Sequence, residues 1–280
     1  MPALWMLLAC IFFAIMAAVI KVLALKISVI EILFYRGGLN LLFISIVMKL
    51  GGISFKTQVP RMHILRSTYG AIAMYCGFYA LANLPLGTAS TLTYTHPIFQ
   101  TIISLLTEPK SVHWFLIIAV LLGFGGCVIL LNPQFSTDST SAALIGVLSG
   151  LFTALAYARV GRLVRGGEPE LRIIFYFALV TTVLSFMITQ LTGGFTELAI
   201  QDLFWILALG TFGTLGQVTL TRAYGRANPI VVGSLAYSQI IFSLILGYWF
   251  FSEAISNSII FGIGLIIASG VLVLFKRVKS

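Results

Sequence analysis

Ten apolar runs of about 20 residues follow one another along this chain, separated by short connections. An α-helix needs about 20 apolar residues to cross the hydrocarbon core of a bilayer, so each run is long enough to span it. The pattern therefore predicts an all-α, polytopic membrane protein with ten transmembrane helices. The runs lie near residues 3–24, 28–49, 63–84, 86–107, 112–132, 142–164, 171–192, 202–223, 229–251 and 256–275.

Composition excludes a soluble fold. Of the 280 residues, 59% are hydrophobic and only 9% are charged, whereas an ordinary soluble domain has roughly 25% charged residues. Cys10, Cys76 and Cys127 lie within apolar runs without a CxxC spacing or a nearby histidine, so we expect them to be small buried hydrophobes. The first run lacks a basic segment before it and a small-residue cleavage site after it, so we expect a retained first helix.

Basic residues predict the orientation of the helices. If the N-terminus is cytoplasmic, 14 of the 17 Lys and Arg residues fall on the cytoplasmic side, and such an excess marks the inner face. We therefore expect a multi-pass protein of the cytoplasmic (inner) membrane with both termini inside. The 14 residues are Lys49, Lys56, Arg61, Arg66, Lys110, Arg159, Arg162, Arg165, Arg172, Arg222, Arg226, Lys276, Arg277 and Lys279.

The two halves of the chain resemble each other. FYR at 34–36 recurs as FYF at 175–177, and YTHPIF at 94–99 lies over YSQIIF at 237–242, with offsets of 141 and 143 residues. Five helices per half is an odd number, so the second half would enter the membrane in the opposite sense, as in inverted-repeat transporters. We expect repeats at residues 1–137 and 138–280; chance similarity between apolar segments is the alternative.

One of the runs is unusually polar. The segment Thr88–Glu108 reads TASTLTYTHPIFQTIISLLTE and has His96 and Pro97 near its middle. Proline removes a helical hydrogen bond, and a break inside a membrane is tolerated only where protein or a wet cavity surrounds it. Broken helices at mid-depth form many transporter binding sites. The alternative is a kinked packing helix whose Thr and Ser side chains bond their own backbone.

Superposition of the halves places Tyr94 over Tyr237 and His96 over Gln239. Polar side chains at mid-membrane are costly unless they face a partner or water, so these pairs favour a shared substrate site. The alternative is hydrogen bonding between helices, worth about 0.6 kcal/mol each. The candidate substrate-binding residues are Tyr94, His96, Gln100, Tyr237, Gln239, Tyr79, Gln217, Tyr157, Arg36 and Lys21.

Two of these candidates are cations. Lys21 lies close enough to the end of its helix to reach the headgroups, whereas Arg36 lies about 12 Å into the second helix. An unpaired cation at that depth costs at least about 2.5 kcal/mol. We expect Arg36 to bond helix-end carbonyls or the other repeat; if it reaches the cavity, the substrate carries a carboxylate or phosphate.

No motif for catalysis, for a metal or for phosphate binding is present, so we expect neither an enzyme nor a cofactor. The expected partners are a small-molecule substrate and the lipid bilayer, with no nucleic acid. A coupling proton or other ion is left open, because His96 alone at mid-depth titrates near neutrality. The choice between a monomer and a homodimer is also left open.

The helix-end segments LPLGTASTLTYTHPIFQTIISLLTEP and ANPIVVGSLAYSQIIFSLILGYWFFSE, together with Lys21 and FYRGG at 34–38, resemble the EamA type of the drug/metabolite transporter superfamily. The resemblance implies a secondary transporter of a small metabolite, with a cavity lined by helices 1, 3, 4, 6, 8 and 9 and with helices 5 and 10 peripheral. Ile240 stands where the second repeat of this family often has proline, so we expect a helix break in the first half only.

We expect the substrate to be an amino acid or a related carboxylate or amphipathic metabolite, moved by alternating access. Flipping of a lipid-linked group is the first alternative function, and a structural membrane subunit is the second. A cavity that opens sideways to lipid would favour the flippase.

Overall fold

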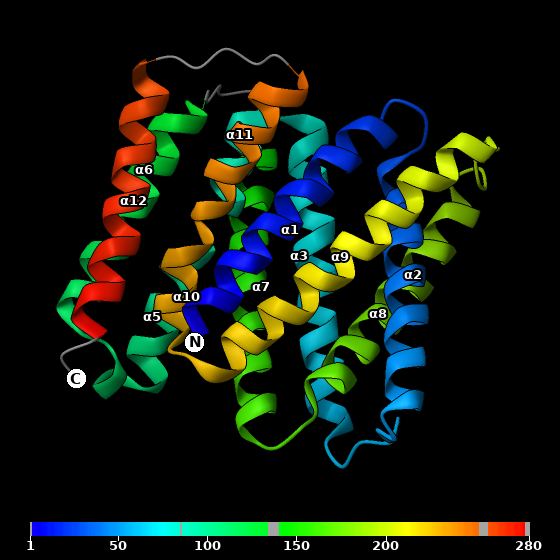
Figure 1. Cartoon of the computed structure of the whole chain (residues 1–280), viewed down its shortest axis with the longest axis horizontal. Helices are drawn as coiled ribbons and strands as arrows, with labels where there is room; N and C mark the ends of the chain where they lie inside the picture. Colours follow the sequence, from blue (N-terminus) through cyan, green and yellow to red (C-terminus); the bar gives the residue numbers. More distant parts are fainter. Residues whose placement is uncertain (1, 85, 134–139, 252–256, 278–280) are drawn as a thin grey trace.

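The structure, a computed structural model, describes residues 2–84, 86–133, 140–251 and 257–277. Within these ranges all regular structure is helical (Figure 1). The elements are α1 (Pro2–Leu23), α2 (Val29–Leu50), α3 (Pro60–Asn83), α4 (Leu86–Thr93), α5 (His96–Thr107), the 3-10 turn η1 (Pro109–Ser111), α6 (Trp114–Leu131), α7 (Thr140–Arg165), α8 (Glu170–Leu191), α9 (Ile200–Arg226), α10 (Pro229–Ala236), α11 (Ser238–Phe251) and α12 (Asn257–Arg277).

Seven described segments are long and apolar enough to cross a membrane. They are Ala3–Leu23, Val29–Leu50, Trp114–Leu131, Thr140–Arg165, Glu170–Leu191, Ile200–Arg226 and Pro229–Phe250. The other apolar runs are occupied by α3, by α4 with α5, and by α12. The expectation of an all-helical, multi-pass membrane protein is thus confirmed, and ten membrane-spanning helices in two repeats stay a prediction.

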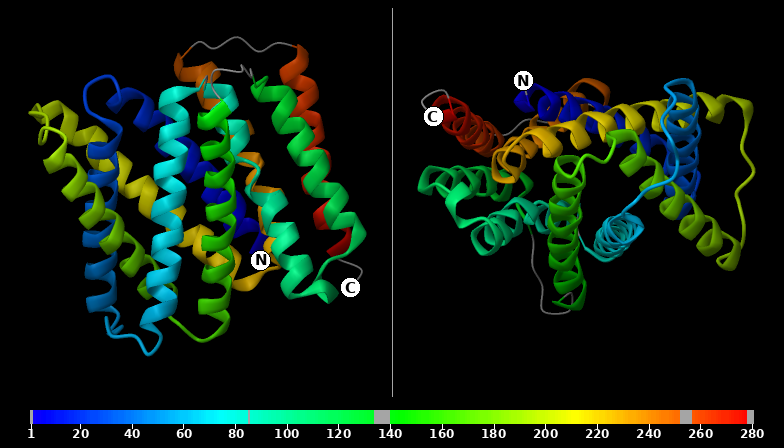
Figure 2. Two further views of the ribbon diagram at one scale, coloured as in Figure 1. Left: turned by 180° about the vertical axis from the view of Figure 1, so that it is seen from behind. Right: turned by 90° about the horizontal axis from the view of Figure 1, so that it is seen from below.

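The helices pack in pairs that join distant parts of the chain. The main pairs are α1 with α9, α3 with α7, α2 with α8, and α6 with α12. Figure 1 shows α1 and α9 crossing the bundle side by side, and Figure 2 shows α6 and α12 together at one edge. α1 begins and α12 ends toward the same side of the bundle.

The polar run at 88–108 is broken, as its sequence predicts. α4 ends at Thr93, α5 begins at His96, and Pro97 occupies the first turn of α5. Proline cannot donate a backbone hydrogen bond, but it fits a first turn, where no helical acceptor exists. Gly150 of α7 lies against this break: a Cβ there would clash with Thr95. α7 can therefore approach the broken backbone closely.

The second half is broken as well, so the expectation of a break in the first half only is wrong. α10 ends at Ala236 and α11 begins at Ser238, with Tyr237 between them and no proline. The Cys10 Sγ atom of α1 lies 3.6 Å from the Leu235 carbonyl oxygen and 3.8 Å from that of Ala236. A thiol is a weak donor, and its contacts with these carbonyls join α1 to the end of α10.

At the other end of α1, one side chain supports both α2 and a neighbouring loop. Ser28 and Glu31 form a capping box: the Ser28 backbone N–H donates to Glu31 Oε2 at 2.8 Å, and the Glu31 N–H donates to Ser28 Oγ. The other oxygen, Glu31 Oε1, accepts from the Thr196 backbone N–H at 2.6 Å. Nearby, Lys26 Nζ lies 2.6 Å from Asp202 Oδ1 at the start of α9. These contacts tie the α1–α2 connection to the α8–α9 connection.

A second set of contacts lies at the opposite end of α2, α3, α7 and α8. We call Glu168, Thr57, His63 and Arg172 the Glu168 cluster. Glu168 accepts hydrogen bonds from Thr57 Oγ1 at 2.7 Å and Arg172 Nη1 at 2.9 Å, and His63 Nε2 lies 3.3 Å from Glu168 Oε2. The cluster joins the α2–α3 and α7–α8 connections across 111 residues of chain.

Candidate functional site

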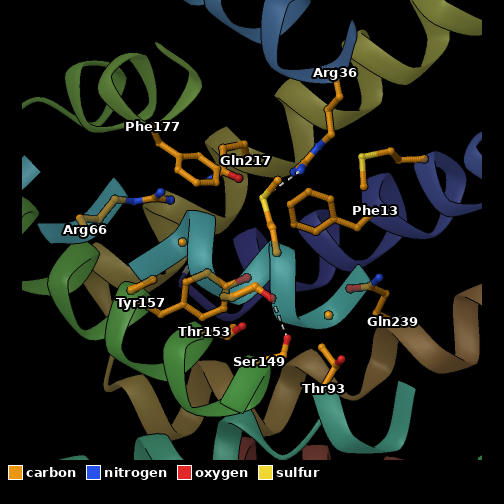
Figure 3. Close-up of a pocket in the computed structure, with 16 residues that line it drawn as sticks. Phe13, Arg36, Arg66, Thr93, Ser149, Thr153, Tyr157, Phe177, Gln217 and Gln239 are labelled. Carbon is orange, nitrogen blue, oxygen red and sulfur yellow. Dashed lines mark hydrogen bonds between the residues drawn. The ribbon is translucent and has the colours of Figure 1, made fainter. Parts of the chain in front are cut away.

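A cavity of about 290 Å³ lies among the helices (Figure 3). This volume is near the lower end of the range of roughly 300–1,000 Å³ found for small-molecule sites. The lining residues are Phe13, Met16, Arg36, Arg66, Gly70, Ala73, Met74, Gly77, Thr93, Ser149, Thr153, Ala156, Tyr157, Phe177, Gln217 and Gln239.

These residues come from α1, α2, α3, α4, α7, α8, α9 and α11. The expected cavity helices, which correspond to α1, α3, α4 with α5, α7, α9 and α10 with α11, all contribute. α2 and α8 contribute too, through Arg36 and Phe177, which the resemblance did not imply. No described residue of α6 or α12 lines the cavity, in agreement with their place at the edge of the bundle.

Four of the ten candidate residues line this cavity: Arg36, Tyr157, Gln217 and Gln239. They come from four helices, α2, α7, α9 and α11, which are far apart in the sequence. The Nε2 atom of Gln217 is buried without a hydrogen-bond partner. A buried unpaired amide is costly, so this atom is available to a ligand.

Four other candidates are not among the lining residues, and three of them pack against one another. Tyr94 contacts His96 and Tyr237, with ring centroids 6.3 Å apart in both pairs, and His96 meets Tyr157 edge-on at 5.7 Å. Gln100 Nε2 donates to the Tyr224 hydroxyl at 2.9 Å, which joins α5 to α9. His96 therefore contacts the lining residue Tyr157 directly, and Gln100 is linked to it through Tyr224, whose ring lies 4.6 Å from that of Tyr157.

Tyr237 is fully buried and is not among the residues that line the cavity. It belongs to a cluster with Cys127, Leu130, Ile240 and Ile266 between the broken helix and the α6–α12 pair. Gly123 of α6 leaves the room for its ring, since a Cβ at that position would overlap it. In this structure Tyr237 is therefore not a wall of the cavity.

The remaining two candidates lie apart from the cavity lining. Lys21 is exposed in the last turn of α1, where headgroup contact was expected. Tyr79 is 37% exposed on α3, two residues after the lining residue Gly77.

The expectation for Arg36 was a bond to helix-end carbonyls or to the other repeat, and its side chain lies against Met74 of α3 and Gly213 of α9. Its Nη1 atom lies 3.9 Å from the Met74 sulfur, and its Nε atom is buried with no hydrogen-bond partner. Glu31, five residues earlier, has its oxygens engaged by Ser28 and Thr196. The Arg36 guanidinium instead lies in the cavity (Figure 3).

Arg66 lines the cavity, although the sequence did not predict it as a site residue. Its place near the start of a helix had put it among the cytoplasmic cations. It is 2% exposed, and its Nε and Nη1 atoms have no hydrogen-bond partner. The guanidinium carbon lies 3.7 Å from the centre of the Phe177 ring, which is a cation–π contact. A signal was present: Arg66 lies six residues after the start of α3, about 9 Å along the helix.

The other polar lining groups are hydroxyls. Ser149 Oγ donates to the Ala73 carbonyl at 2.8 Å and so joins α7 to α3, while Thr93 Oγ1 donates to the Ala89 carbonyl of its own helix. Among the described residues no three His, Cys, Asp or Glu side chains gather as they would around a metal ion. The site offers two cations, amides and aromatic rings, and it is therefore suited to binding a polar organic molecule.

The profile of the EamA-like transporter family matches residues 1–132 and again residues 140–275. The chain belongs to the EamA-like transporter family. It is thus a multi-pass membrane transporter of small metabolites and not an enzyme, as its sequence predicted.

Named relatives of this EamA-like chain include carriers of different compounds. The pseudopaline exporter of Pseudomonas aeruginosa is 32% identical over 272 residues, which cover 95% of this chain and 90% of that protein. An uncharacterized transporter of Helicobacter pylori is 28% identical over 98% of this chain and 96% of its own length. The S-adenosylmethionine uptake transporter of Rickettsia conorii is 24% identical, with coverage of 99% and 93%.

One solved crystal structure has the same fold as the EamA-like chain. Its TM-score is 0.86 at 17% sequence identity, and the match covers 97% of this chain and 96% of that one. At this identity the match shows the fold alone.

Proposed function

We propose that this EamA-like chain is a secondary transporter that moves an amino acid or a related carboxylate metabolite by alternating access. The observation that carries the proposal is the cavity itself. Residues of both halves line it, among them two cations and two amides, and no acidic side chain lines it in the described part of the chain. Arginine is the side chain best suited to a carboxylate, because its fork can donate two parallel hydrogen bonds.

We infer ten membrane-spanning helices in two inverted repeats, residues 1–137 and 138–280. The helix contacts support this, because they are reciprocal between the halves. The first expected span contacts the eighth (α1 with α9), and the third contacts the sixth (α3 with α7), as a two-fold relation requires. The second span contacts the seventh (α2 with α8), and the fifth contacts the tenth (α6 with α12).

The same relation supports alternating access. The Glu168 cluster links the connections at one end of the bundle, and the Lys26–Asp202 and Glu31–Thr196 contacts link those at the other. In an inverted-repeat carrier such ends can exchange the roles of closed and open gate around one fixed site. We place the Glu168 cluster and both termini on the cytoplasmic side of the inner membrane, since the basic residues are concentrated there.

The relatives do not settle the direction of transport. One is named an exporter and another an uptake transporter. The direction for this chain follows from the gradient that drives it, and a coupling proton or other ion stays a prediction. No described carboxylate lines the cavity, and His96→Gln tests whether the imidazole takes part in any such coupling.

Transport in proteoliposomes tests the proposal. The full chain should take up labelled amino acids or related carboxylates, and Gln239→Ala should weaken that transport by about ten-fold or more, because a hydrogen bond to a charged substrate is lost. His96→Ala should weaken it less, because His96 acts on the cavity through Tyr157. Gln190→Ala, at an exposed position of α8, is the matched control.

Membrane levels of each variant must be measured beside its activity. Wild-type transport rates in Gln239→Ala would show that the Gln239 amide does not bind the substrate. Movement of a lipid-linked anion without uptake of any soluble carboxylate would replace the proposal with the flippase function.

A further inference from the structure

Two guanidinium groups enter one cavity from different helices. Arg36 comes from α2 and Arg66 from α3, and Figure 3 shows them pointing toward the same space from different sides. Neither Nε atom has a hydrogen-bond partner, although both are buried. Cations inside a membrane protein are costly without a counter-charge, and such residues mark substrate pathways.

The surrounding residues make room for each arginine. A Cβ on Gly70, one turn after Arg66, would lie 2.7 Å from the Phe177 ring and 3.2 Å from Arg66 Nη1. A Cβ on Gly213 of α9 would lie 3.4 Å from Arg36 Nε. Phe177 and Met74 provide the apolar contacts of the two guanidinium groups. Each guanidinium group is therefore accommodated by a glycine and by an apolar side chain beside it.

The described acidic residues leave both charges uncompensated. Glu168 and Glu170 pair with Arg172, Arg222 and Arg226, and Asp202 pairs with Lys26. Glu31 accepts from Ser28 and Thr196, Glu108 pairs with Arg165, and Glu197 is exposed. None of these six carboxylates lines the cavity. A ligand that enters the cavity can supply the negative charge that the described residues do not.

We propose that the transported metabolite carries two separate anionic groups, one bound by Arg36 and the other by Arg66. This inference rests on the proposed function and deepens it by naming the substrate class. A single carboxylate can pair well with one guanidinium fork, which would leave the second cation buried and unpaired. The amides of Gln217 and Gln239 and the Tyr157 hydroxyl would bind the polar atoms between the two anionic ends.

The test compares anions that differ by one charge at equal size. The full chain, purified in lipid nanodiscs, is titrated with glutamate against glutamine, and with straight-chain dicarboxylates of increasing length against monocarboxylates of the same carbon number. Thermal stabilisation reports binding, and competition in proteoliposomes reports transport. We expect dicarboxylates of one optimal length to bind about ten- to hundred-fold more tightly than their monoanionic partners.

Substitution of each arginine tests whether each binds one anionic group of the substrate. Arg36→Gln and Arg66→Gln should each lower dicarboxylate affinity by about ten- to hundred-fold, and in each variant the preference for two charges over one should disappear. Arg66→Lys keeps the charge but loses the fork, so it should retain part of that preference and serves if Arg66→Gln fails to fold. Arg61→Gln, at an exposed position of the same helix, is the matched control.

Two outcomes separate this inference from the proposed function. If monocarboxylates and dicarboxylates of equal size bind and compete equally, the two arginines grip one anion, and the two-anion inference is overturned while the carboxylate carrier stands. If neither class binds or is transported, the proposed function fails and the inference fails with it. Loss of monoanion binding in both Gln variants, without a change in preference, also contradicts two separate positions.

Discussion

Two glycines leave the room that the cavity arginines occupy, so single methyl groups can test the site. Gly70→Ala would place a Cβ within 2.7 Å of the Phe177 ring, and the ring together with Arg66 would have to shift. Overpacking costs about 1–3 kcal/mol, which corresponds to about five- to hundred-fold if the loss appears in substrate affinity. We expect a raised KM for transport, measured from initial uptake rates in proteoliposomes. Gly125→Ala on α6, which has open space around it, is the control.

An unchanged KM in Gly70→Ala would mean that the Arg66–Phe177 contact can relax without affecting the substrate. Equal loss of membrane expression in both alanine variants would point to a general folding defect. Neither result would separate Arg66 from the cavity lining, so the charge variants remain the direct test of its role.

At the scale of elements, the Glu168 cluster joins two connections by hydrogen bonds to one carboxylate. Burial alone would raise the pKa of Glu168, but hydrogen bonds from Thr57 and Arg172, the nearby His63 and the charge of Arg172 outweigh it, so the pKa lies below its ordinary value of 4.5. A lowered pKa stabilises the folded state above the unfolded pKa, and this contribution is lost as the pH falls through the folded pKa. Glu168→Gln should therefore lower the Tm at neutral pH.

The pH dependence of the Tm distinguishes the effect of the Glu168 charge from that of its hydrogen-bond geometry. The difference in Tm between wild type and Glu168→Gln should shrink as the pH falls below about 4.5, because wild-type Glu168 then becomes neutral as well. Thermal unfolding in detergent across a pH series measures it. Glu197→Gln, exposed in the α8–α9 connection, is the control. A difference that persists at all pH values would assign the effect to hydrogen-bond geometry alone.

The elements themselves could largely be predicted, because apolar run length and proline act locally. The break at Pro97 follows from a missing backbone donor, whereas the break at Tyr237 has no local signal. It coincides with contacts between distant parts of the chain: the Cys10 thiol lies near the Leu235 and Ala236 carbonyls, and Gly123 leaves room for the Tyr237 ring. Arg66 was missed for a similar reason. Arg66 was counted among the cytoplasmic cations although its depth in α3 was a signal, and the position of Phe177, over a hundred residues later, shows that it faces the cavity.

At the scale of the whole molecule, the inverted-repeat arrangement predicts opposite exposure of two connections. A cysteine replacing Lys56, in the α2–α3 connection, should be labelled by a membrane-impermeant thiol reagent only from the cytoplasmic side. A cysteine replacing Glu197 should be labelled only from outside. The three native cysteines are buried, so they give a low background. External labelling at position 56 would reverse the orientation, and labelling of both positions from one side would contradict the odd number of helices between them.

The two helix breaks described above are not equivalent as hinges. At Pro97 one backbone donor is absent for chemical reasons, so an unbroken ladder of helical hydrogen bonds cannot form there in any conformation. At Tyr237 every residue still carries its N–H, and the Tyr237 backbone itself has right-handed helical angles, with φ −59° and ψ −23°. Of the two helix breaks in this carrier, the one at Pro97 is thus required by the chemistry of proline, and the one at Tyr237 is not. The energetic cost of opening need not be the same at its two ends, even though the halves share an architecture.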